Sequence, residues 1–180
     1  MKSDSLESPD SGPPERSSQV IIIGYGNELR GDDAIGRHIV RAIEAQHIRG
    51  VVTADLHQLL PETVELICPC RFAIFVDACL DSAISEVSVT PVILRAADLW
   101  RTHLANPESL LALCQAIHGR MPEAWWVRVP VFTVDFAQGL SVAANHNKTV
   151  ALDKIDRLLK RLIPNSFRQP KNSDPLNSHA

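Results

Sequence analysis

The segment from Val20 to Gly36 constrains the fold of this chain more than any other part of the sequence. It begins with an uninterrupted β-branched run, Val20 to Ile23, which is typical of a strand buried on both faces of a parallel sheet. Glycines then end the run, and the acid pair Asp32-Asp33 precedes an apolar pattern of helical period. In open α/β sheets, ligands bind in the crevice outside the carboxyl ends of the strands. The segment therefore predicts a parallel sheet with a functional crevice where this first strand ends.

The rest of the chain alternates short β-branched runs with longer apolar patterns of helical period, as repeated strand and helix units do. Strands are predicted at residues 19–23, 51–54, 72–76, 87–94 and 125–134, and helices at residues 33–45, 61–67, 107–118 and 145–162. Pro91 favours an edge position for the fourth strand, because proline cannot donate a ladder hydrogen bond. Pro130 falls inside the fifth strand, and Gly119 is expected to end the third helix. The pattern as a whole indicates an α/β fold with a mostly parallel sheet.

The composition fits one globular domain with two polar tails. The chain has 180 residues, of which 45% are hydrophobic and 22% are charged. Residues 1–18 contain almost no apolar side chains and are expected to form a flexible N-terminal extension, and residues 164–180 are expected to form a flexible C-terminal tail. Residues 19–163 are therefore predicted to be the folded domain.

Charge and apolar patterning argue against two classes of partner. The net charge is -3 and the basic residues are scattered, so nucleic acid is not expected to bind. No apolar run approaches the roughly 20 residues that span a bilayer, and the N-terminus lacks the apolar stretch of a secretion signal. No membrane association is expected, and the predicted location is cytoplasmic. In that compartment the four cysteines are expected to be reduced thiols with packing roles: Cys68, Cys70, Cys79 and Cys114.

Carboxylates follow two of the predicted strands. Asp32 and Asp33 come after the first strand, and Asp77 ends the third. Because the carboxyl ends of parallel strands meet at one edge of a sheet, these acids are expected to face one crevice. A structural role is the alternative for each of them. Asp32 and Asp33 could both cap the helix that follows, and Asp77 could cap the next segment or pair with Arg71 or Arg95.

The seven histidines offer a further candidate ligand. His103 lies in a predicted connection between a strand and a helix, where functional residues concentrate, and His57 after the second strand is its competitor. A nucleotide site is another alternative, because a glycine pair follows the first strand and Asp55 ends the second. Leu29 stands where the third glycine of the dinucleotide fingerprint belongs, which makes that match weak.

The stretch from Gly24 to Gly36 resembles the amino-terminal signature of the endopeptidases that mature nickel-iron hydrogenases. Further matches follow in the order of that family at residues 57–62, 75–78, 102–103 and 110–111, and the resemblance covers residues 19–162. It implies a three-layer α/β/α sandwich around a twisted, mostly parallel sheet. It also implies an activity, which is the removal of a C-terminal extension from the hydrogenase large-subunit precursor after nickel insertion.

The three metal-contacting positions of that family fall on Asp33, Asp77 and His103, which the resemblance therefore marks as catalytic and nickel-contacting residues. The nickel is expected to be carried by the substrate precursor. Many relatives carry Glu where Asp33 stands and Gly where Ala34 stands, so this carboxylate is one methylene shorter. The sequence leaves open whether the metal polarises a water molecule or only marks the substrate. The alternative function is a non-catalytic nucleotide-binding or metal-delivery module.

Overall fold

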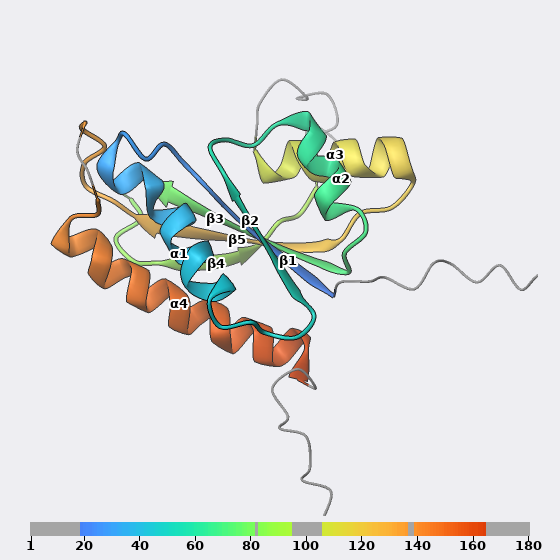
Figure 1. Cartoon of the computed structure of the whole chain (residues 1–180). Coiled ribbons are helices and arrows are strands. Elements are labelled where there is room, and N and C mark those ends of the chain that lie inside the picture. Colours follow the sequence, from blue (N-terminus) through green and yellow to red (C-terminus); the bar gives the residue numbers. More distant parts are fainter. Residues whose placement is uncertain (1–18, 82, 95–105, 137–138, 165–180) are drawn as a thin grey trace, which may run out of the picture.

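A computed structural model describes residues 19–81, 83–94, 106–136 and 139–164 (Figure 1). The five strands are β1 (Val20–Tyr25), β2 (Val51–Leu56), β3 (Phe72–Cys79), β4 (Ser88–Pro91) and β5 (Glu123–Pro130). The α-helices are α1 (Ile35–Glu44), α2 (Val64–Ile67), α3 (Pro107–His118) and α4 (Val142–Leu162). Short 3-10 turns, η1 (Gly31–Ala34) and η2 (Pro61–Thr63), lead into α1 and α2. None of the helices in this part of the chain is long and apolar enough to cross a membrane.

The strands form one sheet in the order β2-β1-β3-β5-β4. All neighbouring pairs are parallel except β4 and β5, which are antiparallel. Figure 1 shows α1 and α4 on one face of this sheet and α2 and α3 on the other. The predicted three-layer sandwich around a mostly parallel sheet is therefore confirmed, and β4 lies at an edge, as Pro91 indicated.

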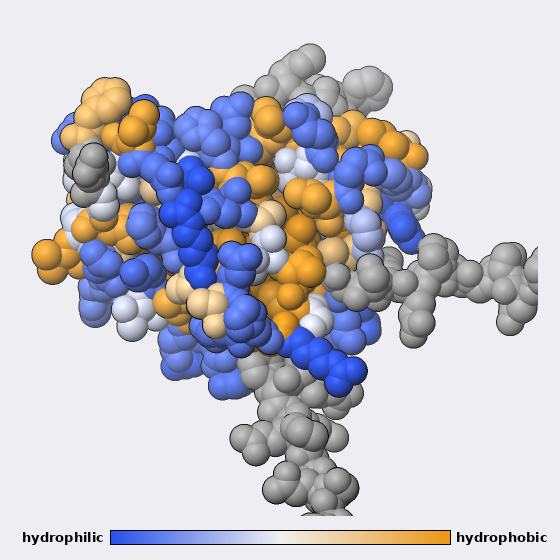
Figure 2. Space-filling model, in the orientation of Figure 1, coloured by the Kyte–Doolittle hydropathy of each residue, from blue (hydrophilic) through white to orange (hydrophobic). Residues whose placement is uncertain are grey.

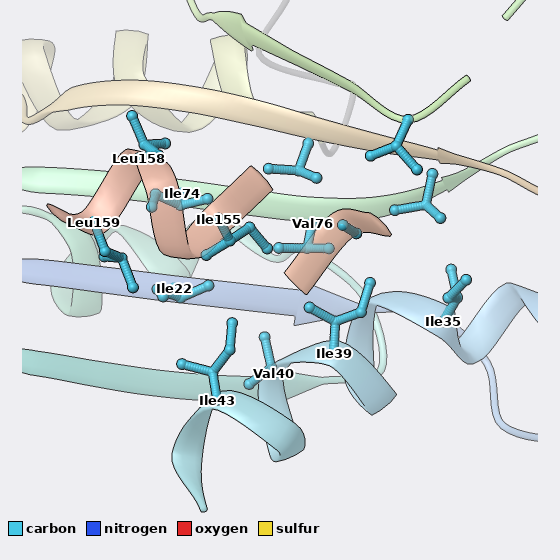
Figure 3. Packing of buried hydrophobic residues seen from close by; sticks show 14 of the residues in the cluster. Ile22, Ile35, Ile39, Val40, Ile43, Ile74, Val76, Ile155, Leu158 and Leu159 are labelled. Atoms are coloured by element: carbon cyan, nitrogen blue, oxygen red, sulfur yellow. The ribbon is translucent and has the colours of Figure 1, made fainter. Parts of the chain in front are cut away.

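Both faces of the central strands are buried, which explains their continuous apolar sequence. Ile22 packs against α1 and α4, whereas Ile21 and Ile23 face the layer of α2 and α3. Figure 3 shows how the first of these layers is filled, with α1 and α4 contributing residues from the inner side of each helix. The outward side of α1 is strongly hydrophilic in Figure 2. The helix is amphipathic, and burial of its apolar stripe fixes its position on the sheet.

Some element boundaries differ from the sequence prediction. The strands β1, β2 and β3 each continue two or three residues further than expected, to Tyr25, Leu56 and Cys79. Pro130 ends β5 instead of lying inside it. The helix α3 has the predicted bounds, and Gly119 follows it in the left-handed conformation with φ of 66°. The helix α4 begins three residues earlier than predicted, because the Ser141 side chain caps it.

Close backbone packing explains two of the glycines near β1. A Cβ atom on Gly24 would lie 2.0 Å from the carbonyl oxygen of Gly36, and one on Gly36 would lie 2.3 Å from the carbonyl oxygen of Val76. The start of α1 therefore contacts the ends of β1 and β3 without any intervening side chain. This contact sets the position of the residues just before α1, which include Asp33, against the end of β3.

The prediction of four reduced cysteines is wrong for one pair. Cys68, at the end of α2, and Cys114, within α3, form a disulfide with their Cα atoms 6.1 Å apart. The two residues are 46 positions apart in sequence, and only the packing of α2 against α3 on one face of the sheet brings them together. The Cys70 and Cys79 side chains remain thiols. The predicted tails, residues 1–18 and 164–180, lie outside the described residues except for Pro164.

Candidate active site

Asp33 and Asp77 approach one another at the carboxyl edge of the sheet. Asp33 lies in η1, directly after the loop that follows β1, and Asp77 lies near the end of β3. They are close enough for the charge of Asp33 to raise the pKa of Asp77. The structure therefore brings together two of the three predicted site residues. The third, His103, lies outside the described residues, as does Arg95.

Asp33 is held by the loop it follows. Its Oδ2 atom accepts a hydrogen bond of 2.7 Å from the backbone N–H of Asn27, six residues earlier in the chain. Neither η1 nor α1 has a hydrogen bond from a side-chain cap, so the expectation that Asp32 or Asp33 caps this helix is wrong. The carboxylate of Asp33 is half-buried and points back over the loop. Within the described residues the other carboxylate oxygen, Oδ1, has no hydrogen-bond partner, which suits it to a ligand at this edge of the sheet.

The carboxylate of Asp77 is largely removed from solvent. Burial raises its pKa to about 6, a hydrogen bond from the Tyr25 hydroxyl lowers it in part, and the negative charge of Asp33 raises it again. Among the described residues Asp77 forms no ion pair, so the alternative of a salt bridge to Arg71 is not observed. Arg71 instead stacks on the ring of Phe72, at the opposite end of β3. A carboxylate with a pKa near neutrality can bind a cation or exchange a proton under physiological conditions.

Tyr25 is a site residue that the sequence analysis did not single out. It is the last residue of β1, and its hydroxyl hydrogen bonds to Asp77. Burial and the neighbouring charge of Asp77 raise the pKa of Tyr25 far above its usual value, so the hydroxyl stays protonated and donates. The indole N–H of Trp126 points towards the same hydroxyl and partly offsets this rise, without the geometry of a full hydrogen bond. The alternation of side chains along a strand could have indicated Tyr25. It places Tyr25 on the same side of the sheet as Ile23, and Asp77 on that same side two residues after Phe75.

Asp32 has a structural role. It is 2% exposed, and its two carboxylate oxygens accept hydrogen bonds from the backbone N–H of Ser141 at 2.7 Å and from the Ser141 hydroxyl at 2.8 Å. The same hydroxyl oxygen accepts a hydrogen bond of 3.1 Å from the backbone N–H of Ala144 and so caps α4. Asp32 therefore ties the start of α4 to the loop that carries Asp33.

We expect Asp32→Ala to lower the free energy of unfolding by about 2 to 3 kcal/mol, because two hydrogen bonds to a buried carboxylate are lost and Ser141 is left with unpaired donors. Urea unfolding followed by circular dichroism measures this change. Any function that depends on Asp33 and Asp77 should persist at temperatures where the variant is folded, because those two side chains are unchanged. A variant of unaltered stability that had lost activity would instead place Asp32 in the chemistry.

The residues needed for a nucleotide site are engaged elsewhere. Asp55, the candidate acid for a ribose, is paired with both Arg37 and Arg41 of α1, and the contact from Arg41 Nε is 2.5 Å. These hydrogen bonds lower the pKa of Asp55 despite its partial burial. The side chain of His57 is exposed, and its backbone carbonyl accepts a hydrogen bond of 3.2 Å from Gly26. The second strand therefore supports the loop through its backbone and supplies no ribose acceptor.

The described part of the chain contains no group of three histidine, cysteine or acidic side chains that could hold a metal ion. Asp33 and Asp77 offer two carboxylates, and a third protein ligand would have to come from residues outside that part, where His103 lies. Two carboxylates and one imidazole are a donor set that suits a divalent transition metal with coordination positions left open.

Several solved structures share this arrangement of strands and helices. The hydrogenase 2 maturation peptidase from a Thaumarchaeota archaeon is 21% identical, with a TM-score of 0.60 over 79% of this chain and 98% of that chain. The hydrogenase maturating endopeptidase HybD from E. coli is 20% identical, with a TM-score of 0.62 over 79% of this chain and 93% of that chain. The chain has the fold of the hydrogenase maturation proteases.

A third example is the NiFe hydrogenase maturation protease HycI from Thermococcus kodakarensis KOD1, which is 17% identical with a TM-score of 0.61 over 79% of this chain and 93% of that chain. No protein-family model and no curated protein matches the sequence. The fold of the hydrogenase maturation proteases is thus evident from the structure, at sequence identities that show the fold alone. Asp33 and Asp77 lie near one another at the carboxyl edge of this fold, where α/β sheets bind ligands.

Proposed function

We propose that this protein is an endopeptidase that removes the C-terminal extension of a nickel-iron hydrogenase large-subunit precursor after nickel insertion. The observation that carries the proposal is the approach of Asp33 and Asp77 at the carboxyl edge of a fold shared with hydrogenase maturation proteases. The signature from Gly24 to Gly36 supports it independently, because it is a feature of the amino-acid sequence and does not depend on the fold.

In this proposal Asp33, Asp77 and His103 contact the nickel that the precursor carries, and the metal is part of the substrate. Asn27 fixes one oxygen of Asp33, and Tyr25 donates a hydrogen bond to Asp77. Two carboxylates and one imidazole leave coordination positions for the residues of the precursor or for water. Because burial raises the pKa of Asp77 to about 6, a cation that binds there must displace a proton from this group at lower pH. Engagement of the loaded precursor should therefore weaken as the pH falls below about 6.

A pair of substitutions at Asp33 tests the role of its charge. Asp33→Asn keeps an oxygen that can accept the hydrogen bond from Asn27 but removes the negative charge, so we expect processing to fall by at least about 100-fold. Asp33→Glu keeps the charge and introduces the residue that stands at this position in many relatives, so we expect it to retain most of the activity. Mass spectrometry of the precursor after a fixed incubation measures both. Equal activity of Asp33→Asn and the unaltered protein would exclude Asp33 as a metal contact.

Within the described residues, the contacts of the second strand argue against the alternative of a nucleotide-binding module. Asp55 is held by Arg37 and Arg41, and Leu29 replaces the third glycine of the fingerprint. A metal-delivery module would use the same two carboxylates without cutting a peptide bond. Cleavage of the precursor by the purified protein separates that alternative from the proposal.

A further inference from the structure

A groove lies away from the loops that carry Asp33 and Asp77. It has a volume of about 580 Å³ and lies between the C-terminal half of α4 and the strands β4 and β5. Figure 1 shows α4 beside this edge of the sheet. The volume is within the range of sites that bind small molecules or peptide side chains, roughly 300 to 1,000 Å³.

The groove is basic although the protein as a whole is acidic. Lys154, Arg157 and Arg161 line it, at spacings of three and four residues that place them on one face of α4. Among the residues that the structure describes, no acidic side chain lines the groove, whereas the net charge of the chain is -3. Arg157 pairs with Asp153 at 2.7 Å, but both side chains are largely exposed, so this ion pair contributes little to stability. A carboxylate of a ligand can therefore replace Asp153 as the partner of Arg157. The charge of the groove therefore complements an anionic ligand.

The remaining lining of the groove is apolar. Trp125 of β5, Val89 of β4 and Leu158 of α4 face it. The ring of Trp125 is packed against the ring of Phe72 with their centroids 5.9 Å apart, which fixes the indole in place. An anionic ligand that also carries an apolar side chain would gain binding free energy by burying this surface, whereas an inorganic anion would leave the surface exposed to water.

The edge strand adds a third element of recognition. Within the described residues β4 pairs with β5 alone, so its other edge has no strand partner. Pro91 contributes a backbone carbonyl to this short strand but no N–H, so the remaining residues of β4 supply the donors. Extended peptides bind exposed sheet edges of this kind by adding a strand, with main-chain hydrogen bonds supplying affinity and neighbouring pockets supplying specificity. Lys154 Nζ donates a hydrogen bond of 2.6 Å to the carbonyl of Val87, just before β4, and so joins α4 to this edge.

We propose that this groove binds an extended acidic peptide segment of a partner protein. The peptide adds a strand to β4, its carboxylates pair with Arg157 and Arg161, and an apolar side chain packs on Trp125. The groove shares no residue with the candidate active site, so the proposal does not depend on the protease function. It assigns a protein-recognition role to the β4 edge.

Fluorescence anisotropy with the full-length protein tests the proposal. The probe is a short labelled peptide that alternates glutamate with leucine, and the comparison peptide carries lysine in place of glutamate. We expect only the acidic peptide to bind, and Arg157→Gln/Arg161→Gln to weaken its binding at least about tenfold. The matched control is Arg49→Gln/Arg120→Gln, which removes the same charge from residues outside the groove and should leave binding unchanged. Equal loss in both double variants, or no loss in either, would overturn the proposal.

Two further probes separate a peptide from a simple anion. An acidic peptide that is N-methylated at alternate positions keeps its charge and side chains but cannot donate backbone hydrogen bonds on one side, and we expect it to bind at least about tenfold more weakly. Inorganic phosphate should compete only weakly. Binding of the N-methylated peptide as tightly as the parent, together with full competition by phosphate at low concentration, would show a small-anion site and contradict the proposed strand addition.

Discussion

Asp77→Asn is expected to abolish processing of the precursor and, at the same time, to make the protein more stable at pH 8. The loss of activity follows from removal of a negative charge that we assign to the contact with nickel. The gain in stability follows from the environment of Asp77. Burial and the charge of Asp33 raise its pKa from 3.8 to about 6, which means that the folded protein disfavours the ionised carboxylate. An uncharged amide of the same shape avoids this cost and can still accept the hydrogen bond from Tyr25.

The sign and the pH range follow from the raised pKa. Between about pH 4 and pH 6 the folded state holds a proton on Asp77 that the unfolded state has released, so the free energy of unfolding falls as the pH rises through this window. Above about pH 6 Asp77 is ionised in both the folded and the unfolded state, so the buried charge destabilises the folded state by its full amount. A rise in pKa from 3.8 to about 6 corresponds to about 3 kcal/mol. The variant should therefore exceed the unaltered protein in stability at pH 8, and the difference should shrink as the pH approaches 4.

Urea unfolding at a series of pH values measures this dependence, with exposed Asp135 as the control through Asp135→Asn. The control should leave the processing of the precursor unchanged. An Asp77→Asn variant that is less stable than the unaltered protein at pH 8 would show that the carboxylate stabilises the fold, and it would contradict the assignment of Asp77 to a functional site.

His103→Ala is expected to abolish processing without changing the far-ultraviolet circular dichroism of the protein. The reason is that the resemblance assigns His103 as the imidazole ligand of the nickel, and Asp33 and Asp77 alone provide only oxygen donors. The matched control is His57→Ala. His57 is the competing candidate in the sequence. Within the described residues it contacts the Gly26 loop through its backbone carbonyl, so the alanine variant should keep its activity. Processing retained by His103→Ala, or lost in His57→Ala alone, would reverse the assignment of the third ligand.

Much of the fold could be predicted from the sequence because local patterns agree with the final packing. The β-branched run before Gly24 indicated a strand buried on both faces, and Pro91 favoured an edge position. Gly119 and the first-turn proline of α3 marked the ends of that helix. The boundaries that were missed depend on tertiary contacts. The start of α4 is fixed by Ser141, whose hydroxyl is held by Asp32 more than one hundred residues earlier.

The candidate site could be predicted only in part, and for a related reason. Strand ends indicated that Asp33 and Asp77 would share one edge of the sheet, and the structure brings them together there. Strand ends and helical period could not separate Asp32 from Asp33, because adjacent positions carry the same signal, and only the family resemblance singled out Asp33. The structural role of Asp32 depends on the packing of α4. The disulfide between Cys68 and Cys114 was missed because it depends on how α2 packs against α3.

The central claim is that the protein cuts a precursor that already carries nickel. The most direct test is the intact mass of a hydrogenase large-subunit precursor after incubation with this protein, measured in parallel for nickel-loaded and nickel-free precursor. We predict loss of a C-terminal peptide from the loaded form alone, because Asp33, Asp77 and His103 are assigned to the metal that the substrate brings. Loss of the peptide from both forms, or from neither, would contradict a nickel-gated endopeptidase.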